Sequence, residues 1–190
     1  MKLFKSLALA GLVGLSSLYG ANYNVDVSHS NIGFKIKHLM ISTVRGNFEN
    51  FSGTFSIDEK SKDFSALSGT VDVASLTTQL AQRDKDLKDK DFFDVKRYPK
   101  MSMQLISQTG NKMLVALTIK DITKNIEMDL KEVNGPINDP WGYIRMAFEL
   151  HGKINRKEFH LSYNKLLETG GLMVGDEVKI DVLIEGIKVK

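Results

Sequence analysis

The chain has 190 residues, a formal net charge of +3 and no cysteine. The lack of cysteine excludes disulfides, thiol nucleophiles and cysteine-ligated metals, and also a lipid-modified cysteine that would tether the chain to a membrane. A charge so close to neutral gives no electrostatic basis for binding nucleic acid.

The first expected element is a cleaved signal peptide over residues 1–21. A basic start precedes an apolar stretch of small residues, and Gly20 and Ala21 offer a small-residue cleavage zone. The apolar run is shorter than the ~20 residues that a membrane-spanning helix needs. We therefore expect export, with residues 22–190 folding as a single domain that is not embedded in a membrane.

Most of the remaining chain alternates between apolar and polar residues with a period of two, which is typical of strands with one buried face. The clearest stretches are 32–36, 67–73, 101–105, 113–119, 126–130, 144–150 and 178–184. A further strand over residues 44–57 changes phase between Phe48 and Phe51, which indicates a bulge near Gly46 or Gly53. About eight strands with short connections predict an antiparallel meander.

Two segments depart from this alternation in informative ways. In the insertion Leu76–Tyr98, Leu80, Arg83, Asp84 and Leu87 share one face of a helix that would begin near Thr77 or Thr78. The second irregular stretch, Asn155–Gly175, contains Gly170-Gly171 and separates the last two long strands. Both insertions would lie at the ends of a barrel, where loops control access to its interior. Between two of the alternating stretches, the segment 135–140 contains two prolines and a glycine and predicts a turn.

The pattern as a whole predicts an all-β protein, an eight-stranded antiparallel β-barrel with a short helix in the Leu76–Tyr98 insertion. A barrel of eight strands is either packed solid or holds one small ligand. Methionine is frequent on the predicted inner face and adapts to irregular shapes, so it suits a long flexible guest, although ordinary core methionines fit equally well. The candidate lining residues are Phe34, Ile36, Met101, Met103, Val115, Leu117, Met128, Met146 and Phe148.

Several blocks of sequence resemble one known family. They include the opening Tyr23–Phe34 (YNVDVSHSNIGF), the run Ser75–Thr78 followed by Arg83-Asp84, the run Asp91–Val95, and Ile154-Asn155-Arg156. In order and spacing these blocks resemble the YceI-like family, also called polyisoprenoid-binding proteins. The resemblance implies a lipocalin-like barrel, exported to the periplasm, that binds isoprenoid lipids such as quinones or prenyl phosphates, or another long-chain fatty amphiphile. It also makes a homodimer plausible.

Polar residues at the barrel mouth are candidates for contacts with a ligand's head group: His38, Arg83, Asp84, Asn155 and Arg156. Each has a structural alternative. Arg83 and Asp84 also suit a brace between the helix and the barrel rim, His38 a hydrogen-bonded position in the core, and Asn155 with Arg156 a support for a strand end.

No catalytic or metal site is expected. Asp26, His29 and Ser30 have the residue types of a nucleophilic triad, but they lie too close along an extended segment to converge on one reacting atom. His151 and His160 lack the spacing of a zinc pair. The sequence therefore predicts a carrier without cofactor or catalysis; a solid-core structural barrel and a lipid-modifying enzyme are the alternatives.

Overall fold

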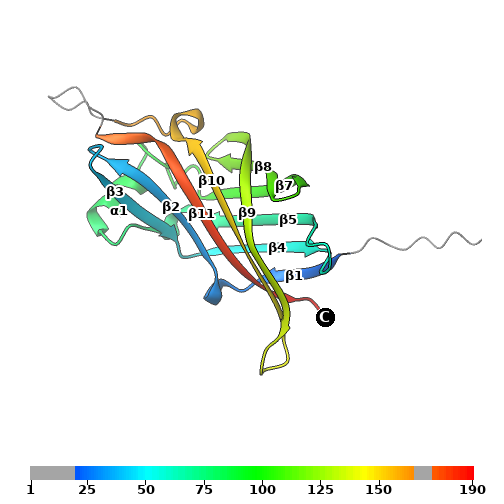
Figure 1. Ribbon diagram of the computed structural model, residues 1–190. Helices are drawn as coiled ribbons and strands as arrows, with labels where there is room; N and C mark the ends of the chain where they lie inside the picture. The colour runs from blue at the N-terminus through cyan, green and yellow to red at the C-terminus, as the bar shows by residue number, and fades with distance from the viewer. Residues whose placement is uncertain (1–19, 165–172) are drawn as a thin grey trace, which may run out of the picture.

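The described residues, 20–164 and 173–190, form one antiparallel sheet that closes on itself in the computed structural model (Figure 1). The expected signal peptide lies outside these residues except for Gly20 and Ala21. The strands are β1 (Ala21–Val25), β2 (Asn31–His38), β3 (Ser42–Phe48), β4 (Phe51–Ile57), β5 (Phe64–Asp72), β6 (Leu76–Thr77), β7 (Lys100–Thr109), β8 (Lys112–Ile119), β9 (Ile122–Asn138), β10 (Ile144–Asn155) and β11 (Val174–Lys188). The helices are η1 (Val27–His29), η2 (Val73–Ser75) and η3 (Arg156–Phe159), each a single 3₁₀ turn, and α1 (Ala81–Lys88).

Eight of these strands close the ring in the order β1-β4-β5-β7-β8-β9-β10-β11, with β11 pairing back to β1. The other three are second pieces of strands in this ring. β2 follows β1 and pairs with β11, β3 precedes β4 and pairs with β2, and β6 follows β5 and pairs with β3. Three of the eight barrel strands are thus interrupted. This arrangement confirms the predicted eight-stranded antiparallel barrel.

Two of the three interruptions, at Glu49-Asn50 and at η2, are joined by hydrogen bonds. The amide of Asp72 donates to the carbonyl of Asn50 at 2.8 Å, and the amide of Asn50 donates to Ser75 Oγ at 2.9 Å. The change of phase after Phe48 therefore comes from a break at Glu49 and Asn50, and the predicted bulge near Gly46 or Gly53 was wrong. Aspartate fits these breaks because its carboxylate accepts the free amides of a tight turn, as Asp72 does from Ala74.

The short helix of the insertion is α1, as predicted, but it begins at Ala81 rather than near Thr77 or Thr78. Thr77 belongs to β6, and the amide of Thr78 donates to the Asp84 carboxylate at 2.8 Å, so the two threonines anchor the helix instead of starting it. The predicted turn at 135–140 is also displaced. Strand β9 continues to Asn138 and accommodates Pro136 at a shift in its register against β10.

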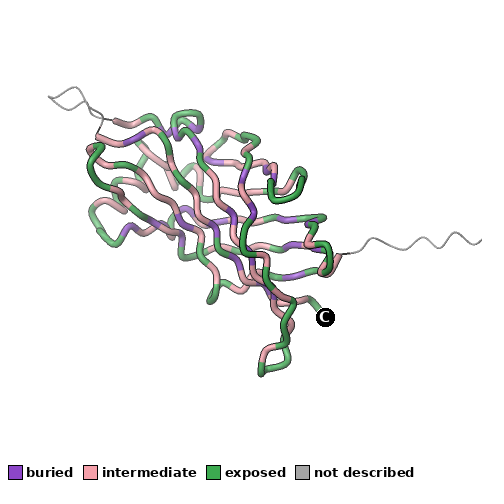
Figure 2. Tube along the Cα trace, viewed as in Figure 1, coloured by how far each residue is buried: buried purple, intermediate pink, exposed green. Residues whose placement is uncertain are grey.

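Buried side chains fill one end of the barrel. We call this end the closed half and define it by the buried cluster of Tyr23, Phe55, Ile57, Phe64, Leu67, Met113, Val115, Met128, Leu130, Met146, Phe148, Leu150, Val182 and Ile184. Its aromatic rings are in contact: Tyr23 stacks on Phe55 with centroids 4.9 Å apart, and Phe148 meets Phe55 edge-on at 5.1 Å. In Figure 2 the buried stretches run along the strands, while the β9–β10 tip is exposed.

The position of Phe55 depends on a glycine of β11, which is separated from β4 in the sheet only by β1. A Cβ atom on Gly186 would lie 2.4 Å from the Phe55 ring, well inside van der Waals contact. Strand β11 therefore leaves the space that the ring occupies. Each aromatic side chain buried in this way contributes about 1.5–3 kcal/mol to the stability of the fold.

Candidate functional site

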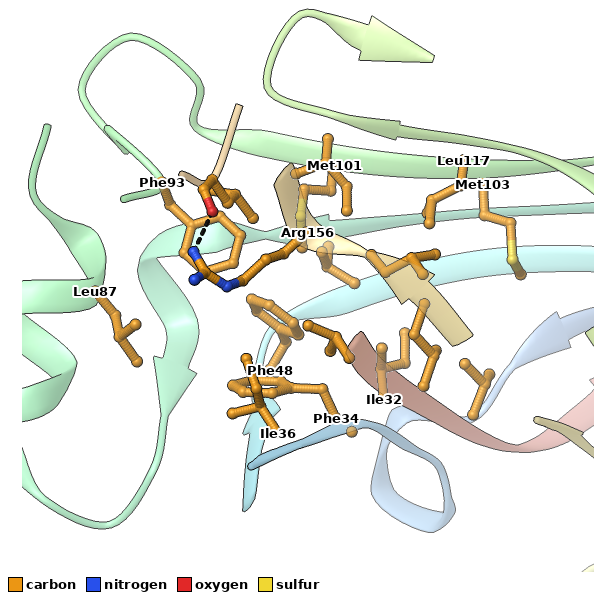
Figure 3. Close-up of a pocket in the computed structure, with 18 of the residues that line it drawn as sticks. Ile32, Phe34, Ile36, Phe48, Leu87, Phe93, Met101, Met103, Leu117 and Arg156 are labelled. Atoms are coloured by element: carbon orange, nitrogen blue, oxygen red, sulfur yellow. Dashed lines mark hydrogen bonds between the residues drawn. The ribbon is translucent and has the colours of Figure 1, made fainter. Parts of the chain in front are cut away.

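Beyond the closed half, the barrel interior is hollow. A cavity of about 560 Å³ is lined by residues of every described strand except β6, with α1 and the segment after it at one end. Its wall is mainly apolar, and Figure 3 shows aromatic, aliphatic and methionine side chains converging on it. This volume falls within the 300–1,000 Å³ typical of small-molecule sites.

Seven of the nine lining residues named from the sequence lie on the cavity wall: Phe34, Ile36, Met101, Met103, Leu117, Met128 and Phe148. The other two, Val115 and Met146, do not. Val115 is 0% and Met146 2% exposed, and both pack among the side chains of the closed half. Alternation shows which side chains point into a barrel, but not how far along its axis the interior is filled.

The methionines divide between the two environments. Met101 and Met103 line the cavity and are half-buried, whereas Met113 is fully buried in the closed half. Met113 is thus an ordinary core methionine, whereas Met101 and Met103 border the cavity, and their contact with a guest stays a prediction.

Several wall residues were not named from the sequence. Ile32 and Phe48 lie in the inward phase of β2 and β3, Leu87 belongs to α1, and Phe93 follows it (Figure 3). The period-two pattern already contained Ile32. Phe93 lies in the run Asp91–Val95, which resembles the family but has no alternation that would show that Phe93 faces the interior.

A glycine helps to keep the interior open. Gly69 of β5 pairs with Met103 of β7 on the inward face, between Leu67 and Val71. A Cβ atom there would meet only the carbonyl oxygen of Ser52, at 3.7 Å. Strand β5 therefore contributes no side chain at this level of the wall, and the space remains free.

The mouth of the cavity is the end at which charged and polar residues line it, namely Lys37, His38, Arg83, Asp86, Asp89, Asp91 and Arg156. Among the predicted mouth residues, His38, Arg83 and Arg156 therefore line the cavity, whereas Asp84 and Asn155 do not. The contacts of these residues show which of them retain donors for a ligand.

Arg83 and Asp84 hold α1 against the barrel. Arg83 Nε donates to Thr78 Oγ1 at 2.8 Å and its Nη2 to the Thr78 carbonyl at 2.9 Å. Asp84 accepts hydrogen bonds from the amide and hydroxyl of Thr78 and from the hydroxyl of Thr77. Burial opposes the ionisation of Asp84, but these bonds outweigh it and lower the pKa of the carboxyl. In the described part of the chain, Arg83 Nη1 has no hydrogen-bond partner, so Arg83 keeps donors available at the mouth.

Arg156 has its donors committed to the protein itself. It is 3% exposed; Nε donates to Gly175, Nη1 to the carbonyls of Leu161 and Tyr163, and Nη2 to Val174 and Asp176. A guanidinium has five N–H groups, and five acceptors surround this one. Burial lowers the pKa of Arg156 while Asp176 opposes that shift. Arg156 therefore braces the segments on both sides of residues 165–172.

Asn155 also has a structural contact. Its side chain accepts a hydrogen bond from the amide of Lys157 at 3.0 Å and caps η3. Asn155 is exposed and points away from the cavity wall, which supports the alternative of a strand-end brace.

The opening motif with Asp26 and His29 lies outside the cavity and surrounds an arginine. Arg145 Nη1 donates to Asp26 at 2.7 Å and to Glu185 at 2.6 Å, and its Nε donates to Asp139 at 2.6 Å. Hydrogen bonds from Ser28, then from His29 and Arg145, lower the pKa of Asp26. Sequence reasoning missed Arg145, which is distant from the motif along the chain.

This cluster lacks the geometry of a triad, and its two carboxylates are already paired with a cation. Ser28 and Asp26 both contact His29 Nδ1, at 3.1 and 2.8 Å, whereas a triad needs its nucleophile and carboxylate on opposite ring nitrogens. The donor atoms of Asp26, His29 and Glu185 lie within 4.8 Å of one another, but Arg145 already supplies the cation that pairs with both carboxylates.

No helix in residues 20–164 and 173–190 is long and apolar enough to cross a membrane.

A family model described as "YceI-like domain" matches residues 23–186. The chain is 38% identical over 155 residues to UPF0312 protein plu2095 of Photorhabdus laumondii, covering 78% of this chain and 80% of that protein. It is similar to the crystal structure of the Campylobacter jejuni YceI protein, with a TM-score of 0.68 and 33% identity over 87% of this chain and 96% of that one. A polyisoprenoid binding domain from Saccharophagus degradans shares the fold at 13% identity, with a TM-score of 0.64 over 88% of this chain and 98% of that one.

Proposed function

The chain belongs to the YceI-like family, and we propose that it is a periplasmic binding or carrier protein whose barrel holds a long-chain isoprenoid-type lipid, such as a quinone, a prenyl phosphate or a similar amphiphile. One observation carries this proposal: an apolar cavity of about 560 Å³ inside a barrel whose other end is packed solid. The description of the Saccharophagus degradans domain as polyisoprenoid binding agrees with it. The periplasmic location rests on the predicted signal peptide, and a homodimer stays a prediction.

Binding would be driven by burial of the guest's chain. Burial of apolar surface contributes about 25 cal/mol per Å², from which the cost of immobilising a flexible chain is subtracted. Most contacts in the wall are apolar and non-directional, so the chemistry of the tail is loosely specified. Any preference for a head group must come from the few polar residues at the mouth, of which Arg83 has uncommitted donors.

The alternatives explain less of the molecule. A solid-core structural barrel accounts for the closed half but not for the cavity or for the bare position at Gly69. A lipid-modifying enzyme needs an acid, a base and a nucleophile that converge beside the guest, and the Ser28–His29 arrangement lies outside the cavity.

The proposal is tested by filling the cavity from Gly69. The Gly69→Leu variant places an isobutyl group in the interior, where the wall is open, so we expect it to fold normally and to lose most uptake of a prenyl alcohol or quinone. Thr70→Leu is the matched control, because successive side chains point to opposite faces of a strand. Uptake is measured by native mass spectrometry. Equal uptake by both variants and the wild type contradicts binding in the barrel.

A further inference from the structure

The inner end of the cavity, here called its floor, is formed by residues that also belong to the closed half. Leu67, Met128, Phe148, Leu150, Val182 and Ile184 each line the cavity and also belong to the buried cluster. Phe148 is the largest of them. Its ring is 2% exposed and packs edge-on against Phe55 at 5.1 Å and Phe64 at 4.9 Å. A chain that enters at the mouth therefore ends at a rigid aromatic surface.

The volume above this floor limits what can be enclosed. A methylene group takes roughly the share of volume that a water molecule has in its liquid, about 30 Å³. The 560 Å³ cavity thus holds on the order of 20 carbon groups. That corresponds to one chain of about four isoprene units; two acyl chains of a phospholipid need well over that volume.

From the floor and the volume together, we propose that the barrel is a ruler that selects single-chain amphiphiles of about 20 carbons, with Phe148 setting the limit. This inference rests on the proposed function and specifies its ligand class. A longer chain is bound with its first units enclosed and the remainder outside the mouth, so units beyond the fourth add little affinity. The limit follows from rigid packing behind Phe148, because closely packed interiors do not yield to a guest.

The test is a ladder of isoprenoid alcohols, namely farnesol, geranylgeraniol and geranylfarnesol, which have three, four and five isoprene units. For the wild type, we expect Kd to fall at least about tenfold from three units to four, and less than about threefold from four to five. In Phe148→Ala the floor recedes, so the gain of about tenfold persists to the fifth unit.

The control is Ile57→Ala, which removes a fully buried side chain from the closed half without touching the cavity, and it keeps the wild-type ladder. If Phe148→Ala does not fold, Phe148→Leu replaces it with the same direction and a smaller shift. A wild-type affinity that keeps rising at the same rate to five units overturns the ruler, as does an identical ladder in the Phe148 and Ile57 variants. If alcohols bind without a chain-length limit, only the ruler fails. If no alcohol of any length binds, the proposed function fails as well.

Discussion

The closed half of the barrel and the half that contains the cavity, here called the hollow half, are built from the same strands. They differ in the side chains that those strands direct into the interior. Strand β5 shows the difference within a few residues: Leu67 packs into the closed half, and Gly69 leaves space in the hollow half. Where aromatic rings meet, as at Tyr23 and Phe55, the interior is filled. The packed end of the sheet contributes most to stability, and the hollow end is the proposed binding region, so we expect substitutions in the two to have different effects.

The largest expected effect is a difference in stability between two methionine-to-alanine substitutions, one in each half. Met113→Ala removes a fully buried side chain from the closed half and leaves a void, which costs about 2–5 kcal/mol in the free energy of unfolding. Met103→Ala removes a side chain that already borders the cavity, so we expect a loss below about 1 kcal/mol. Urea unfolding of both variants measures this difference. Equal losses would mean that Met103 is packed as tightly as Met113.

A second substitution tests the brace at the mouth. Arg156→Met leaves the carbonyls around it without donors, and we expect a loss of about 2–3 kcal/mol together with faster amide exchange in 161–164. Lys157→Met is the control, because this neighbouring lysine forms only an exposed pair with Asp176 and contributes less than about 1 kcal/mol. If Arg156 stabilises only the mouth, amide exchange in β1 and β4 is unchanged in Arg156→Met. Faster amide exchange in these two strands would mean that the closed half depends on the mouth.

The smallest expected effect concerns the outer wall. His151 contacts Asp181 through Nδ1 at 3.0 Å and Glu149 through Nε2 at 2.9 Å; Lys35 pairs with Asp181, and Asp129 lies opposite on β9. The bond to Asp181 and that to Glu149 raise the pKa of His151 despite its partial burial.

Because the folded-state pKa is the higher one, the stabilisation from His151 is fully present below the unfolded pKa near 6.5 and is lost as the pH rises through the folded value. The difference in free energy of unfolding between wild type and His151→Gln should therefore shrink from about pH 5.5 to about pH 9. Guest affinity should not change with this substitution, since the side chain faces away from the cavity. A difference that grows with pH would contradict the assigned contacts.

The fold followed from the sequence because a period of two is a local property that each strand carries by itself. The inward phase of Phe34, Met101 and Leu117 was readable for that reason. The division into two halves was not, since filling depends on contacts between segments far apart in the sequence, as where the Phe55 ring occupies the space that Gly186 leaves free. Arg156 was named from the sequence, but only its five acceptors show that it braces the mouth. Arg145 was missed because two of its three partners, Asp26 and Glu185, are distant along the chain.

The most direct test of the central claim, that the hollow half holds a lipid chain, is native mass spectrometry of the protein purified without detergent from the cells that produce it, followed by organic extraction. The account predicts one bound single-chain amphiphile per barrel, absent from the Gly69→Leu variant and present in Thr70→Leu. Protein that carries no adduct and takes up neither added quinone nor prenyl alcohol would contradict it.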